Sequence, residues 1–191
     1  MSRVVTENTN MIKNIFALAA VALAMVATPA MAQTAAFDGA RVGVLAGTTG
    51  DDHPFDDAEF TYGGVIGYDF AVSDAFLLGV EADIASVSID TGGYDVDNRQ
   101  LSAAVRGTFP VSPAAAVFVS GGYTNLDFSE DNVSVDFDGF RLGGGAEFNI
   151  SSRAYASVEY RYSQYDLGNV GGFDLGSEGV NSALVGLGLR F

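Results

Sequence analysis

Apolar side chains recur at every second position in a series of segments between residue 40 and the C-terminus. No window after residue 33 keeps the 3.6-residue apolar spacing of an amphipathic helix. Alternation at period two is typical of β-strands that bury or expose one apolar face. The pattern predicts an all-β fold with eight strands, at residues 40–47, 60–70, 76–84, 99–109, 117–123, 137–150, 155–162 and 180–191.

The connections between these segments alternate in length. Short connections are predicted at 71–74, 110–113 and 149–153, and long ones at 48–58, 85–97, 124–136 and 163–178. In an antiparallel up-and-down barrel this alternation places every long loop at one end, which is typical of outer-membrane barrels. A soluble sandwich or lipocalin-like barrel also alternates, so connection length alone leaves both classes open.

The two faces of the predicted strands differ in charge. One face carries no charged residue, and the other carries five acids and five arginines: Arg41, Asp69, Glu81, Asp83, Arg106, Arg141, Glu147, Glu159, Arg161 and Arg190. A water-facing surface gives no reason for this balance or for the lack of lysine. Inside a narrow barrel, planar guanidinium groups match carboxylates at close quarters, and unpaired charge is costly. We therefore predict a salt-bridged lumen and an apolar belt that faces lipid.

Glycines and aromatic residues refine this prediction. Eight glycines share the charged face, where they would leave room for long side chains inside an eight-stranded lumen: 43, 63, 67, 79, 143, 145, 186 and 188. Aromatic residues gather beside the short connections, as in the interfacial girdle of a membrane barrel. They are Tyr68, Phe70, Phe76, Phe109, Phe148, Tyr155 and Phe191.

The N-terminal region resembles an export signal. Lys13 precedes an apolar run from 15 to 26, and Ala30-Met31-Ala32 forms a small-x-small cleavage pattern. The run is too short for a transmembrane helix, which needs about 20 residues. We predict a cleavable signal peptide at 1–32, with Met11 as an alternative start, and a barrel domain at 33–191.

Four stretches resemble the OmpA-like and opacity-protein-like eight-stranded outer-membrane barrels: FLLGVEADI (76–84), FRLGGGAEF (140–148), ASVEYRYSQYDLG (156–168) and the terminal GLGLRF. The resemblance implies a location in the outer membrane of a Gram-negative bacterium, among outer-membrane lipid and lipopolysaccharide. It also implies insertion by the barrel assembly machinery, with Phe191 as part of the assembly signal. Many OmpA-type relatives carry a peptidoglycan-binding domain after the barrel, and we expect none here.

Composition argues against several functions. The chain has no cysteine, which excludes disulfides and thiolate metal sites, and its net charge of −15 disfavours nucleic acid as a partner. The one histidine, His53, lies in a carboxylate-rich loop with no serine near it in sequence. We therefore predict neither enzymatic activity nor a cofactor, and a lipid deacylase or protease is disfavoured.

The long connections are rich in carboxylates and contain no lysine or arginine. Asp95, Asp97, Asp136 and Asp138 show the alternate-acid spacing of calcium loops, but the twelve-residue pattern with its closing Glu is incomplete. They are weak candidates for divalent cations, and a solvated acidic surface explains them equally.

These observations support a structural or surface-exposed barrel with a plugged, charged lumen and acidic extracellular loops. A small-solute porin with a narrow channel is the main alternative, and a soluble periplasmic ligand-binding barrel is a third.

Overall fold

The computed structural model describes residues 34–51, 54, 58–90, 95–130, 133–166, 169–170, 173–174 and 176–191. The predicted signal peptide and His53 lie outside the described residues. Within them, no helix has the length and apolar character needed to cross a membrane.

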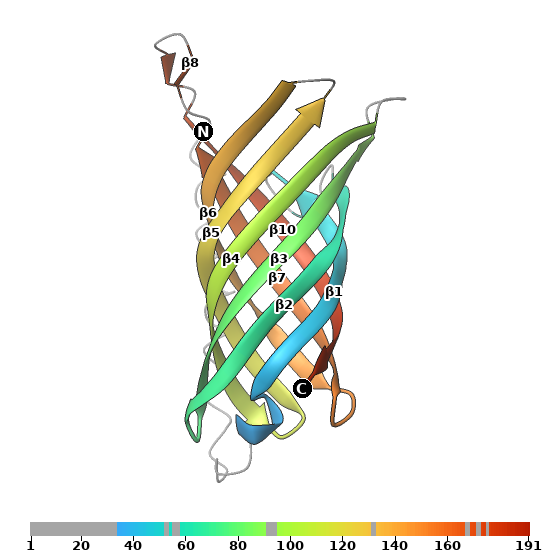
Figure 1. Ribbon diagram of the computed structural model, residues 1–191, viewed down its shortest axis with the longest axis vertical. Coiled ribbons are helices and arrows are strands. Elements are labelled where there is room, and N and C mark those ends of the chain that lie inside the picture. The colour runs from blue at the N-terminus through green and yellow to red at the C-terminus, as the bar shows by residue number, and fades with distance from the viewer. Residues whose placement is uncertain are drawn as a thin grey trace, which may run out of the picture.

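Eight long strands form one closed antiparallel barrel, as predicted (Figure 1). They are β1 (Gly39–Gly50), β2 (Glu59–Ser73), β3 (Phe76–Asp90), β4 (Asp95–Ser112), β5 (Ala115–Glu130), β6 (Val133–Asn149), β7 (Ala154–Asp166) and β10 (Ser177–Arg190). Each strand pairs with its neighbours in sequence, and β1 pairs with β10 from Arg41↔Arg190 to Gly50↔Asn181. The ring therefore has no open edge, as a β-structure in lipid requires.

Three minor elements lie outside the barrel sheet in the described part of the chain. A single 3-10 turn, η2 (Thr34–Ala36), precedes β1 and lies at the lower end of the barrel in Figure 1, at the same end as the C-terminus. The connection between β7 and β10 contains a small hairpin of β8 (Asn169–Val170) and β9 (Phe173–Asp174).

The connections alternate in length as expected. Turns at 74–75, 113–114 and 150–153 join β2 to β3, β4 to β5 and β6 to β7, and they share one end with η2 and Phe191. The register shifts at Ala71/Ser73 and at Pro110/Ser112. Pro110 cannot donate a backbone hydrogen bond, and it sits beside that irregularity at the end of its strand.

The predicted long connections were wrong in extent, because the strands continue into them. β3 and β4 remain paired up to Asp90↔Asp95, and β5 and β6 up to Glu130↔Val133. Beyond the lipid belt the outward face no longer needs apolar side chains. The alternation that marks a strand in the sequence therefore ends before the backbone pairing does.

The outer surface between the two ends is an apolar band. Its exposed side chains include Val44, Ile66, Val80, Val105, Val119, Leu142, Val158, Val185 and Leu187. Soluble monomers rarely expose apolar patches beyond a few hundred Å². Polar and charged residues are instead buried inside the barrel, an inside-out arrangement that fits lipid as the surrounding solvent.

Aromatic side chains mark both borders of this band. Tyr68, Phe70, Phe109, Phe148 and Phe191 are exposed near the short turns, and Phe60, Tyr62, Tyr123, Phe140 and Tyr160 lie toward the other end. From Tyr62 to Phe70 on β2, and from Phe140 to Phe148 on β6, there are nine residues. A tilted strand needs ~9–11 residues to cross a bilayer.

The placement of Tyr155 in the girdle was wrong. Its side chain is only 3% exposed and points into the barrel. Tyr155 has the same parity along β7 as Glu159 and Arg161, and parity decides the face of a strand. Its position near a turn is coincidental.

Candidate functional site

The barrel interior brings together the ten charged residues predicted for the inward face. They come from every barrel strand except β5. Nine of them are at most 7% exposed, and the side chain of Glu159 is also 7% exposed. Their common parity accounts for this convergence, since successive side chains of a strand point to opposite faces. The interior is thus a single cluster with five positive and five negative groups.

Small residues on neighbouring strands make room for the long side chains. Arg106 is paired with Gly79 and Ser120, Arg141 with Gly122 and Ser163, and Arg161 with Gly143 and Ser182. Each arginine can therefore cross the lumen instead of meeting a bulky neighbour.

Glycine is required sterically at several of these positions. A Cβ at Gly79 would lie 2.1 Å from Asp69 Oδ1, and one at Gly67 would lie 2.9 Å from Arg41 Nη2. A Cβ at Gly143 would lie 2.8 Å from Glu159 Oε1. A larger residue at these glycine positions would need space that the charged side chains of the network already fill.

The network begins near the short-turn end with two shared carboxylates. Asp69 Oδ2 accepts from Arg41 Nε at 3.0 Å and from Arg190 Nη1 at 3.1 Å. The Glu147 carboxylate receives Arg190 Nη2 at 2.7 Å and Arg106 Nη2 at 2.9 Å. Arg190 therefore joins carboxylates on β2 and β6, two strands that are not neighbours.

The network continues through β3 toward the long-loop end of the barrel. Glu81 accepts from Arg41 Nη2 at 2.5 Å and from Arg141 Nη2 at 2.6 Å. Arg141 also donates to Asp83, and Arg161 Nη1 reaches Asp83 Oδ2 at 3.3 Å. Arg161 Nε completes the chain on its own strand with Glu159 Oε1 at 2.7 Å.

Most of these contacts join strands that do not pair in the sheet. Arg141 on β6 reaches β3 directly across the barrel, and Arg41 on β1 reaches β3 past β2. Such contacts restrain the width and shape of the barrel independently of its backbone ladder.

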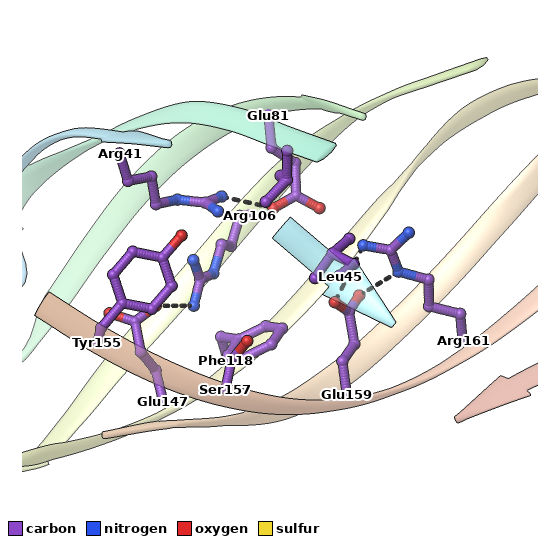
Figure 2. Close-up of a pocket in the computed structure, with 11 residues that line it drawn as sticks. Arg41, Leu45, Glu81, Arg106, Phe118, Glu147, Tyr155, Ser157, Glu159 and Arg161 are labelled. Atoms are coloured by element: carbon purple, nitrogen blue, oxygen red, sulfur yellow. Dashed lines mark hydrogen bonds and ion pairs between the residues drawn. The ribbon is translucent and has the colours of Figure 1, made fainter. Parts of the chain in front are cut away.

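Very little empty space remains among these groups. One cavity remains among them, with a volume of ≈ 10 Å³. It is bordered by Arg41, Glu81, Arg106, Glu147 and Tyr155. This volume is about that needed for one water molecule. Figure 2 shows Arg41, Arg106 and Arg161 converging on this cavity, with contacts to Glu81, Glu147 and Glu159.

Uncharged layers lie on both sides of the network. Toward the long-loop end, Gln100 Nε2 donates to Thr124 Oγ1 at 3.0 Å and to Tyr165 OH at 2.7 Å, and Ser102 contacts Thr124. Toward the short-turn end, Phe37, Leu77 and Ala116 form a buried apolar cluster. Phe118 lies between, with its ring centroid 3.9 Å from the Arg106 guanidinium carbon.

Several of these interior residues are uncharged, so the charge pattern of the sequence does not predict them. Phe118, Thr124, Tyr155 and Tyr165 have the inward parity, and this signal was available in the sequence. Phe37 precedes the first strand and follows no alternating pattern, so no periodic signal could reveal its position.

The four cation candidates lie on two strands that do not pair with each other. Asp95 and Asp97 are on β4, while Asp136 and Asp138 are on β6, with β5 paired between them. Asp138 Oδ1 accepts hydrogen bonds from the Tyr123 hydroxyl and from Asn125 Nδ2, at 3.1 Å for the latter. These bonds, that of Tyr123 first, lower the pKa of Asp138. Across the described residues, no group of three or more potential ligands is positioned to hold a metal.

Sequence comparison gives one family match. The sequence profile described as "Outer membrane protein beta-barrel domain" matches residues 18–191. No curated protein matches the chain.

Solved structures of low sequence identity share the fold. Ail, the attachment invasion locus protein of Yersinia pestis, is 14% identical with a TM-score of 0.54, over 81% of this chain and 97% of Ail. The N-terminal barrel of Pseudomonas aeruginosa OprF is 17% identical with a TM-score of 0.54, over 79% and 97%. The outer membrane enzyme PagL is 15% identical with a TM-score of 0.52, over 79% and 99%.

Proposed function

This chain belongs to the outer membrane protein beta-barrel domain family, and we propose that it serves the bacterial outer membrane as a structural, surface-exposed barrel with a closed lumen. Family membership supports the location. The closed lumen and the structural role rest on the interior of this particular chain.

The observation that carries the proposal is the filling of the lumen by the ten-charge network. Arg106, Arg141 and Glu147 are at most 2% exposed inside the barrel. The cavity bordered by Arg41, Glu81, Arg106 and Glu147 has room for about one water. An ion that crosses the barrel would have to separate several buried ion pairs, each of which is costly to break.

The surface role is supported by the asymmetric outer end. β4 has 18 residues and β6 has 17, whereas β1 has 12, so the β3–β6 side extends beyond the rest of the rim (Figure 1). This extension carries acids along its strands, including Asp90, Asp95, Asp127 and Asp138. Its negative charge favours a repulsive, solvated surface over adhesion to anionic lipopolysaccharide, unless divalent cations bridge the two.

Catalysis is not part of this proposal. PagL is an outer membrane enzyme with the same fold, but fold does not determine activity. The chain has one histidine, His53, which lies outside the described residues and carries no catalytic proposal.

Single-channel recording tests the closed lumen. The protein is refolded in detergent, inserted into a planar lipid bilayer and compared with a large water-filled porin under the same conditions. We expect no steady conductance above the leak of the bare bilayer. Regular conductance steps would contradict the proposal and would favour the small-solute porin.

A further inference from the structure

Residues 34–38, which precede the first strand, lie across the short-turn end of the barrel instead of extending away from it. The segment contains η2 and Phe37, and Phe37 N donates to Thr34 O at 2.9 Å to close a tight turn. Phe37 is fully buried and Thr34 is 7% exposed. Figure 1 shows this turn beneath the barrel mouth.

The seat of Phe37 is apolar and is built from two strands, β3 and β5, that flank β4 in the barrel wall. Leu77 at the start of β3 and Ala116 at the start of β5 form the cluster with Phe37, at 0% and 1% exposure. Ala36 packs against the same cluster. Leu77 and Ala116 are far apart in the sequence, and the pairing of β3, β4 and β5 brings them together beneath Phe37.

Polar contacts fix the segment to further strands. Asn149 Nδ2, at the end of β6, donates to Ala36 O at 3.3 Å, and the Asp38 carboxylate accepts from Ala71 N at 2.9 Å. On β10, Arg190 Nη1 donates to Phe37 O. The same nitrogen lies 3.1 Å from Asp69 Oδ2, so the segment is bonded directly to the ionic network.

The geometry of this end explains why a separate segment is needed. The turns here contain two to four residues, at 74–75, 113–114 and 150–153. Turns of this length cannot fold across the mouth of the barrel. Without residues 34–38, the lower side of Arg190, Asp69 and Glu147 would face the aqueous compartment at this end.

We propose that residues 34–38 act as a periplasmic stopper that seals the charged lumen, with Phe37 as its plug and Arg190 as its latch. The short-turn end of an outer-membrane barrel faces the periplasm. The inference extends the proposed closed lumen by assigning the seal at one end. Conductance measures passage through the whole barrel, whereas access to the stopper's seat is measured at that end only, so the two claims can fail separately.

Cysteine labelling tests the stopper, because the natural chain has no cysteine. Two reporters are placed in the seat, Leu77→Cys and Ala116→Cys, each with Phe37 intact and each combined with Phe37→Asp. The refolded proteins are treated with a charged, water-soluble thiol reagent. Burial of a phenylalanine favours the docked segment by roughly one to two orders of magnitude. We therefore expect slow labelling with Phe37 and at least about tenfold faster labelling with Phe37→Asp.

A control reporter toward the other end of the lumen shows whether a change in labelling is confined to the seat of Phe37. Ser102→Cys is 2% exposed in the native chain and is far from the segment along β4. Its labelling rate should not change with Phe37→Asp, and heat-dependent gel mobility should show that every variant is folded. Rapid labelling of both seat reporters with Phe37 intact would overturn the proposal. Unchanged labelling with Phe37→Asp, or equal acceleration of Ser102→Cys, would overturn it as well.

Discussion

At the scale of single residues, the interior arginines act by sharing one guanidinium group between two carboxylates. Arg141 is fully buried and bonds Glu81 and Asp83, while Arg190 bonds Asp69 and Glu147. The planar fork of arginine suits this geometry, and the single ammonium of lysine does not. This explains why the inward face holds arginine alone as its cation.

Removal of Arg141 should therefore be strongly destabilising. Arg141→Ala leaves Glu81 and Asp83 each with one arginine partner fewer, since only Arg41 and Arg161 remain in contact with them. A loss of about 3–5 kcal/mol in unfolding free energy is expected for a broken buried pair. Urea unfolding in lipid vesicles, followed by gel mobility, measures the change.

Arg153 provides the matched control, because its side chain is exposed in the β6–β7 turn. Arg153→Ala should alter the unfolding free energy by less than about 0.5 kcal/mol. Equal losses for the two variants would mean that the buried network does not stabilise the barrel.

The partners within the network could not be predicted from the sequence. Parity places Arg106, Glu147 and the other charged residues inside, and this follows from period two alone. Which carboxylate meets which arginine depends on strand tilt and on the stagger around the ring. Neither property can be read from the sequence of a single strand. The sequence therefore places Arg106 in the lumen but does not identify Glu147 as its partner.

At the scale of strands, the glycines of the inward face are spacers for side chains on neighbouring strands. Gly79→Ala would bring a methyl group to 2.1 Å from Asp69 Oδ1 and 3.0 Å from Tyr68 O. Asp69 cannot move freely, since it holds Arg41 and Arg190. We expect a loss of about 1–3 kcal/mol from overpacking, measured by the same unfolding assay.

Gly64 is a suitable comparison, because it lies on the outward face of β2. The nearest atom to a Cβ there is Gly43 O, at an ordinary 3.7 Å. Gly64→Ala should be neutral or mildly stabilising, since alanine restricts the unfolded chain. A greater loss for Gly64→Ala than for Gly79→Ala would contradict the assignment of faces.

Phe191 follows the last strand directly, and we predict that it acts in the assembly of the barrel. Phe191 N donates to Ala40 O at 2.8 Å, and the ring is 72% exposed toward the lipid side. Deletion of Phe191 removes one backbone bond and little packing, so the folded barrel should lose only about 0.5–1.5 kcal/mol. Insertion into the outer membrane, measured as the fraction of heat-modifiable protein in cells, should fall much further.

A truncated chain that inserts as efficiently as the full chain would contradict the predicted role of Phe191. Refolding of both chains in detergent serves as the control, because no assembly machinery is present there and the two should then behave alike.

At the scale of the whole molecule, alternation predicted the strand number, the barrel class and the two faces, because lipid and lumen impose opposite demands on successive residues. Alternation gave no prediction in the segments that lie outside the lipid belt. The outer extensions of β3 to β6 lack the pattern, and the Phe37 segment packs through one side chain without any repeat. In both places the backbone contacts are made without an alternation of apolar and polar side chains.

The central claim is that the apolar face meets lipid while the opposite face fills the interior. The chain has no tryptophan, so a single one can report on each face. Val105→Trp places it in the middle of the band, where the native side chain is 54% exposed, and Phe118→Trp places it inside, where the native ring is 4% exposed. Heat-dependent gel mobility first shows that both variants are folded in vesicles.

Fluorescence quenching by lipids that carry bromine in the middle of their acyl chains is the most direct measurement. The account predicts strong quenching of Val105→Trp and little quenching of Phe118→Trp. Quenching of Phe118→Trp as strong as that of Val105→Trp, or no quenching of Val105→Trp, would contradict it.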